Sequence, residues 1–89
     1  MKIVPLGIKE AEEFLSKHER HYKMPVEAIC AIGVAEGDLI HGAAILGRRE
    51  DGDAELAHIY VDGVSQGYSL LYGACWRALK ALGYERTYL

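Results

Sequence analysis

The chain has 89 residues and a formal net charge of −3, with 51% hydrophobic and 26% charged residues. This length predicts a single domain, residues 1–89, and the composition excludes an intrinsically disordered chain. The acidic balance argues against a nucleic-acid-binding protein. The longest apolar run, from Ala28 to Ala35, is too short to span a membrane, and the first residues lack the apolar core of a signal peptide. We therefore expect a cytoplasmic protein with its two cysteines reduced.

The first half of the chain predicts a strand, a helix and a hairpin. Lys2–Leu6 is typical of a short strand, and the apolar spacing within Lys9–Tyr22 indicates an amphipathic helix. Pro25 prevents that helix from continuing. Glu27–Ala35 and Leu39–Gly47 are apolar on both faces, which is typical of central strands covered on both sides.

The second half predicts a strand, a helix and a last strand. Ala54–Val61 is the third long strand, and a Gly-containing loop, Asp62–Gly67, separates it from a helix over Tyr68–Leu82. Gly83 suits the position that ends this helix, and Tyr84–Leu89 begins another strand. The order β-α-β-β-β-α-β predicts an α/β fold of the α+β kind, a mainly antiparallel sheet flanked by two helices.

The passage from strand to helix after Val61 is a candidate phosphate site. The first amides of a helix have no partner within the helix, and the helix dipole favours an anion beside them. Gly63 and Gly67 permit tight turning, whereas the sequence holds neither an NTPase P-loop nor a Gly-x-Gly-x-x-Gly fingerprint. The alternative is an ordinary strand-to-helix turn with no ligand.

Three segments, Ala54–Asp62, Gly67–Leu71 and Ala78–Tyr84, carry a family resemblance. Together they resemble the acyl-CoA-binding block of the GNAT acyltransferase superfamily: a Glu-Leu-x-x-Leu-Tyr-Val strand, a turn of the form Arg/Gln-x-x-Gly-x-Gly/Ala, a helix and a Gly-Tyr entry to the next strand. The resemblance implies a GNAT-like domain with this block at residues 54–89. It also implies truncation, because the full family fold continues with a helix and two further strands. Val64 departs from the family, which prefers Arg or Gln at that position.

The resemblance also implies acetyl-CoA as cofactor and a set of positions that bind it. The pantetheine arm would pair, like an extra strand, with the backbone of Ile59, Tyr60 and Val61. The diphosphate would lie on the amides of the following turn, with the contacts Val64, Gln66, Gly67, Tyr68 and Ser69. Because no Lys or Arg occurs between Asp53 and Trp76, we expect weaker binding than in a family member with the Arg.

The implied reaction moves an acetyl group from acetyl-CoA to an amine of a small molecule or peptide. A lysine-like amine is almost fully protonated at pH 7, and deprotonating it costs about 4.6 kcal/mol. Glu55 is the first candidate for the general base and His58 the second. Their spacing of three along a regular strand predicts opposite faces. The alternatives are a solvated carboxylate for Glu55 and a packed, hydrogen-bonded ring for His58.

Other side chains have simpler interpretations. His18 and His21 lie three apart on one helix but lack a third ligand, so we predict no metal site. His41, in an apolar strand, is expected to be hydrogen-bonded. Trp76 is expected to lie at a covered margin of the core, with contact to a second chain as the alternative.

Tyr84–Leu89 would form an unprotected edge strand, so we predict a homodimer through that strand, with neither nucleic-acid nor membrane partners. Two functions of other classes stay open beside acetyl transfer. One is a non-catalytic acyl-CoA-binding or structural dimerisation domain, and the other is a fragment of a longer acetyltransferase.

Overall fold

The computed structural model describes residues 1–18, 27–63, 65–84 and 87–88. The elements follow the predicted order and form a small α+β fold. They are β1 (Lys2–Leu6), α1 (Ile8–His18), β2 (Ala28–Glu36), β3 (Leu39–Arg48), β4 (Ala54–Val61), α2 (Ser65–Ala81) and β5 (Thr87–Tyr88). Neither described helix is both long enough and apolar enough to cross a membrane.

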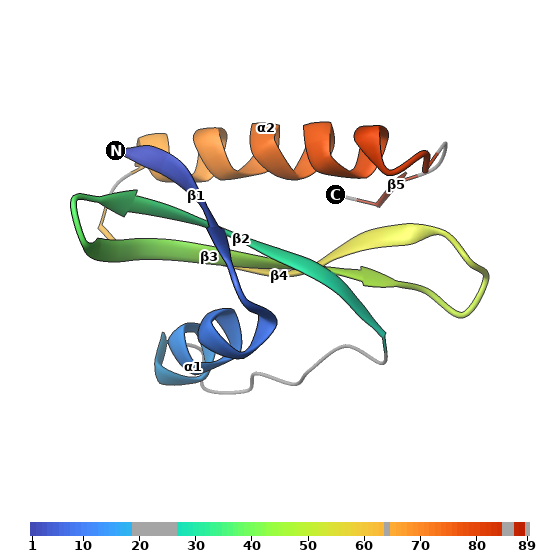
Figure 1. Cartoon of the computed structure of the whole chain (residues 1–89), viewed down its shortest axis with the longest axis horizontal. Helices are drawn as coiled ribbons and strands as arrows, with labels where there is room; N and C mark the ends of the chain where they lie inside the picture. Colours follow the sequence, from blue (N-terminus) through green and yellow to red (C-terminus); the bar gives the residue numbers. More distant parts are fainter. Residues whose placement is uncertain (19–26, 64, 85–86, 89) are drawn as a thin grey trace.

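The strands form one sheet in the order β1-β2-β3-β4-β5. The first four strands are antiparallel to their neighbours, which confirms the mainly antiparallel prediction. β5 runs parallel to β4, and its two described residues pair with Ala54 and Glu55. Figure 1 shows α1 on one face of the sheet and α2 on the other, so both faces of the central strands are covered.

Each face of the sheet has its own core. The α2-face cluster joins residues of β2, β3 and β4 to one side of α2: Val34, Ala44, Leu46, Ala54, Val61, Leu71, Cys75 and Leu79. The α1-face cluster joins the alternate strand positions to one side of α1: Ala11, Leu15, Ala31, Ala43 and Ile45. Successive side chains of a strand point to opposite faces, which is why the apolar runs in β2 and β3 have no polar alternation.

Gly83 ends α2 as predicted. Its φ of 90° lies in the left-handed region that glycine adopts without a steric penalty. The Tyr84 amide donates to the Leu79 carbonyl, and the Gly83 amide donates to the Lys80 carbonyl. These two bonds are the Schellman arrangement, and Tyr84 also packs on the α2-face cluster that includes Leu79.

Three sequence predictions need correction or lie outside the described residues. α2 begins at Ser65 and not at Tyr68, so Gly67 lies inside the helix. Trp76 is not at a covered margin, because it is 48% exposed; the Lys80 ammonium lies 5.9 Å from its ring centroid. The described part of the first helix ends at His18, and residues 19–22 of the prediction are outside the description.

A helical glycine at position 67 makes the close packing of α2 on β4 possible. A Cβ at Gly67 would lie 2.5 Å from Cγ1 of Val61, whereas a Cβ at Gly73 would meet only the tip of the flexible Arg77 side chain, at 3.2 Å. We expect Gly67→Ala to lower the free energy of unfolding by about 1–3 kcal/mol, because overpacking outweighs the gain in helix propensity. The matched control, Gly73→Ala, should raise it by about 0.5–1 kcal/mol. Thermal unfolding measures both, and equal effects would contradict this packing.

The buried Cys75 thiol predicts a loss of stability at alkaline pH. Burial raises the pKa of Cys75 to about 12, and the nearby Cys30 adds to the rise. Unfolding exposes a thiol that ionises near pH 8.5, so this contribution to stability is full below that pH and is lost as the pH rises toward 12. Urea titrations at rising pH should show a steeper loss of unfolding free energy for the wild type than for Cys75→Ala. Parallel slopes would show that Cys75 does not contribute.

Candidate functional site

The end of β4 and the start of α2 form a tight strand-to-helix passage. Gly63 has a φ of 66°, in the left-handed region, and turns the chain immediately after the strand. Two residues later α2 begins at Ser65, and its first turn contains no acidic residue. The helix dipole and the first amides therefore favour an anion at this end of α2.

The residues predicted to hold a diphosphate lie in different environments within this first turn. Gln66 and Ser69 are exposed, Tyr68 is half-buried against the α2-face cluster, and Gly67 is buried against Val61. Val64 lies outside the described residues. Gly67 thus serves helix-to-strand packing, whereas the sharp turn falls on Gly63.

A histidine and an aspartate link β3 to this passage. His41 Nδ1 lies 3.0 Å from Asp62 Oδ1, and the Asp62 amide donates to the His41 carbonyl at 2.8 Å. On the other side of the ring, His41 Nε2 lies 3.8 Å from Glu36 Oε2. The prediction of a hydrogen-bonded His41 is confirmed. We refer to His41 and Asp62 together as the His41–Asp62 pair.

Within the described part of the chain, one edge of β4 has a partner strand only at its beginning. β3 pairs with β4 from Ala54 to Val61 on one side, whereas β5 pairs only with Ala54 and Glu55 on the other. Among the described residues no strand continues that second ladder, so outward backbone groups of the Ile59–Val61 segment have no partner strand there. Such an edge can accept an extended chain through main-chain hydrogen bonds.

A bulge in β4 overturns the prediction that Glu55 and His58 point to opposite faces. The register with β3 shifts by one residue: Leu46 is opposite Leu56, whereas Ile45 is opposite His58, so β4 carries one extra residue, Ala57. Side chains on opposed positions share a face, and Ile45 belongs to the α1-face cluster. His58 and Glu55 therefore lie on the same face of the sheet, the one that α1 covers.

Tyr60 lies farther along this same face and packs on the end of α1. Its ring stacks on His18 with centroids 5.0 Å apart and planes 16° apart, and Phe14 lies 4.4 Å from His18. The predicted cofactor-contacting residues therefore divide between the faces. Ile59 packs in the α2-face cluster, where Val61 is buried, and Tyr60 packs on the α1-face cluster. What Ile59, Tyr60 and Val61 have in common is that their backbone lies along the same edge of β4.

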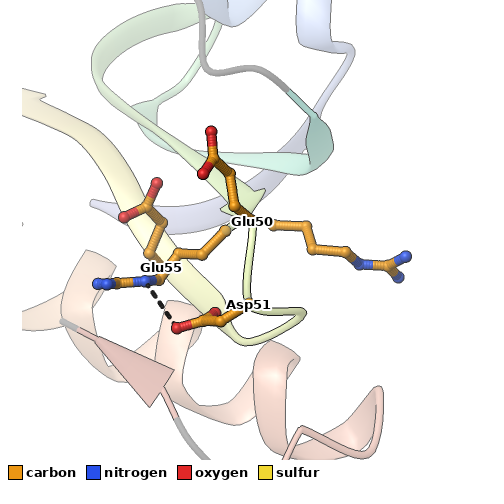
Figure 2. A pocket seen from close by; sticks show the side chains of 5 residues that line it. Glu50, Asp51 and Glu55 are labelled. Carbon is orange, nitrogen blue, oxygen red and sulfur yellow. Dashed lines mark ion pairs between the residues drawn. The ribbon is translucent and has the colours of Figure 1, made fainter.

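A polar pocket lies beside Glu55, at the turn between β3 and β4. It has a volume of about 500 Å³ and is lined by Arg48, Arg49, Glu50, Asp51 and Glu55. In Figure 2 the Glu50 and Glu55 carboxylates are directed to one side, while Asp51 is joined to an arginine by an ion pair, which is the 3.5 Å contact from Arg49 Nε. Arg48 is engaged elsewhere, by Glu27 at 3.5 Å and by the Tyr84 hydroxyl at 2.7 Å.

The two ends of β4 therefore have chemically different surroundings. Glu55 and its pocket are at the first end, and the anion-favouring start of α2 is at the other. Glu55 and Val61 are six positions apart, which is about 20 Å of strand. His58 lies between them, on the Glu55 face. Among the residues that the structure describes, no group of three or more His, Cys, Asp or Glu side chains could hold a metal ion.

Sequence reasoning missed the His41–Asp62 pair and the hairpin pocket. The pair follows from the β3–β4 register. Gly42 is opposite Val61, so His41, which precedes Gly42, lies beside Asp62, which follows Val61. Counting back from the hairpin turn would instead place His41 opposite Val61, because the bulge at Ala57 shifts the register by one residue. No sequence pattern indicated the pocket, because its shape depends on how the turn between β3 and β4 folds.

Comparison of the chain with protein-family models, with curated proteins and with solved structures finds no match.

Proposed function

We propose that the chain binds acyl-CoA along β4 and the start of α2 and transfers an acetyl group from acetyl-CoA to an amine. The observation that carries this proposal is the coincidence of two features at one end of β4. The open backbone edge at Ile59–Val61 leads directly to a helix start without acidic side chains. The GNAT-like motifs of residues 54–84 fall on these elements.

The order of the parts along β4 supports a direction for the cofactor. A diphosphate at the first amides of α2 would lie next to Val61, and an arm paired with the edge of β4 would extend from there toward Glu55. The thioester at the end of this arm would then approach the face and end of the sheet that hold His58 and Glu55. A polar pocket of about 500 Å³ at that end offers room for an acceptor.

The proposed step needs a base for the amine. A carboxylate or imidazole takes a proton from the ammonium, and the neutral nitrogen attacks the thioester carbonyl to form the C–N bond. The C–S bond then breaks, and the surplus proton on the nitrogen passes to the departing CoA thiolate. Glu55 is half-exposed and borders the pocket, so it can reach a bound amine. The bulge at Ala57 leaves His58 on the same face, as the second candidate.

Cofactor binding is tested with the apo protein and CoA. We expect CoA to shift the backbone amide resonances of Gln66, Gly67, Tyr68 and Ser69 and of the Ile59–Val61 edge, because both sets of amides would gain new acceptors. Resonances of α1 serve as the internal control. If millimolar CoA moves neither set, the CoA proposal is wrong.

Catalysis is tested by the release of thiol from acetyl-CoA in the presence of a panel of amines. Glu55→Gln keeps the size of the side chain and removes the base, and we expect it to slow turnover by about 10²–10⁴ with CoA affinity unchanged. Glu13→Gln, an exposed carboxylate on α1, is the matched control and should not change the rate. An unchanged rate in Glu55→Gln with a large loss in His58→Gln would assign the base to His58.

A non-catalytic acyl-CoA-binding domain is the second candidate. It is favoured by the absence of Lys and Arg between Asp53 and Trp76, because the segment that would bind the cofactor then supplies no cation of its own. CoA-dependent amide shifts without thiol release from any amine would support this second function.

A further inference from the structure

A groove lies between β1 and α2, on the face of the sheet opposite α1. It has a volume of about 350 Å³, which is at the lower end of the range typical of small-molecule sites. Ile3, Pro5 and Ile32 line the groove from the sheet, and Ala74 and Arg77 line it from the helix. None of these residues belongs to the polar hairpin pocket or to the proposed cofactor edge of β4.

The groove forms because β1 moves away from α2 along its length. At the start of β1, Met1 lies beside the first turn of the helix, with its Sδ 3.5 Å from where a Cβ of Gly67 would be. Ile3 still packs on the α2-face cluster, whereas Pro5, two positions further along the same face of the strand, is exposed. Figure 1 shows β1 running from the start of α2 toward α1. Apolar surface at this edge of the sheet is therefore left uncovered between the strand and the helix.

Arg77 is the only charged side chain among the described residues that line the groove. The side chain folds back along α2, and its Nη1 lies 3.2 Å from the position that a Cβ of Gly73 would take. Within the described part of the chain, no carboxylate pairs with this guanidinium and no acceptor binds it by a hydrogen bond. An anion in the groove would therefore meet a cation whose donors are available to it.

We propose that this groove binds an aliphatic monocarboxylate, with its hydrocarbon chain on Ile3, Pro5 and Ile32 and its carboxylate at Arg77. A guanidinium presents two parallel N–H donors that match the two oxygens of a carboxylate. Because one cation balances one negative charge, a monocarboxylate suits the groove better than a phosphate dianion does. Contact of the CH₂ groups with the apolar lining removes hydrocarbon surface from water and supplies most of the affinity. This inference does not depend on the proposed acetyl transfer.

The test is a titration of the full chain with hexanoate, followed by the methyl resonances of Ile3, Ile32 and Ala74. We expect saturable shifts with a Kd in the millimolar range, because so small a ligand has few atoms to bury. The methyl groups of Leu39, which is 62% exposed and lies outside the groove, report non-specific adsorption and should not shift. Hexanol, which keeps the hydrocarbon chain and lacks the charge, is titrated in parallel.

Two variants remove one positive charge each from the same helix. Arg77→Gln should weaken hexanoate binding about threefold or more and leave the affinity for hexanol within about twofold of wild type. Lys80→Gln is the matched control, because Lys80 lies beside the Trp76 ring and outside the groove. It should leave both affinities within about twofold of wild type. Thermal unfolding of each variant checks that the fold is kept.

Several results would overturn the proposal. These are the absence of a saturable shift at the groove methyl groups up to about 50 mM hexanoate, a parallel shift of Leu39, or wild-type affinity for hexanoate in Arg77→Gln. An equal loss in Lys80→Gln would show that only net charge matters. An equal loss of hexanol binding in Arg77→Gln would show that Arg77 acts through packing and not through its charge.

Discussion

The close approach of α2 to β4 depends on one valine held between two glycines. A Cβ on Gly67 would lie 2.5 Å from Cγ1 of Val61, and a Cβ on Gly42 of β3 would lie 2.7 Å from Cγ2 of the same residue. Val61 is itself 5% exposed. Because interiors are packed to crystal-like density, neither glycine can gain a methyl group without a shift of the strand or the helix. This contact fixes where the first turn of α2 lies relative to the open edge of β4.

The bulge at Ala57 is the second constraint, because it places the apolar core side chains of β4 on one face of the sheet and the candidate catalytic side chains on the other. Before and after the bulge, Leu56 and Ile59 face α2 and extend its apolar cluster. Glu55 and His58 face the other way. A regular strand would have turned one of the two polar residues into the α2-face cluster, where an unpaired carboxylate or imidazole is costly. One inserted residue thus keeps the core apolar and gathers the polar side chains on one face.

The proposed chemistry uses the two ends of β4 differently. At the Val61 end, backbone amides and a helix dipole would bind an anion. At the Glu55 end, half-exposed side chains surround a polar pocket. Because no Lys or Arg occurs between Asp53 and Trp76, the proposed cofactor-binding segment itself would offer only such dipoles to an anion.

The sequence by itself determined the element order, the covered central strands and the end of α2 at Gly83. These depend on local patterns: apolar runs on two faces, a 3.6-residue period and a glycine after the last turn. Tertiary structure decided the start of α2, the exposure of Trp76, the common face of Glu55 and His58, and the His41–Asp62 pair. Each of these depends on which residues meet across the sheet. A one-residue shift of register reverses the side chains of a strand, and the period of the sequence does not reveal such a shift.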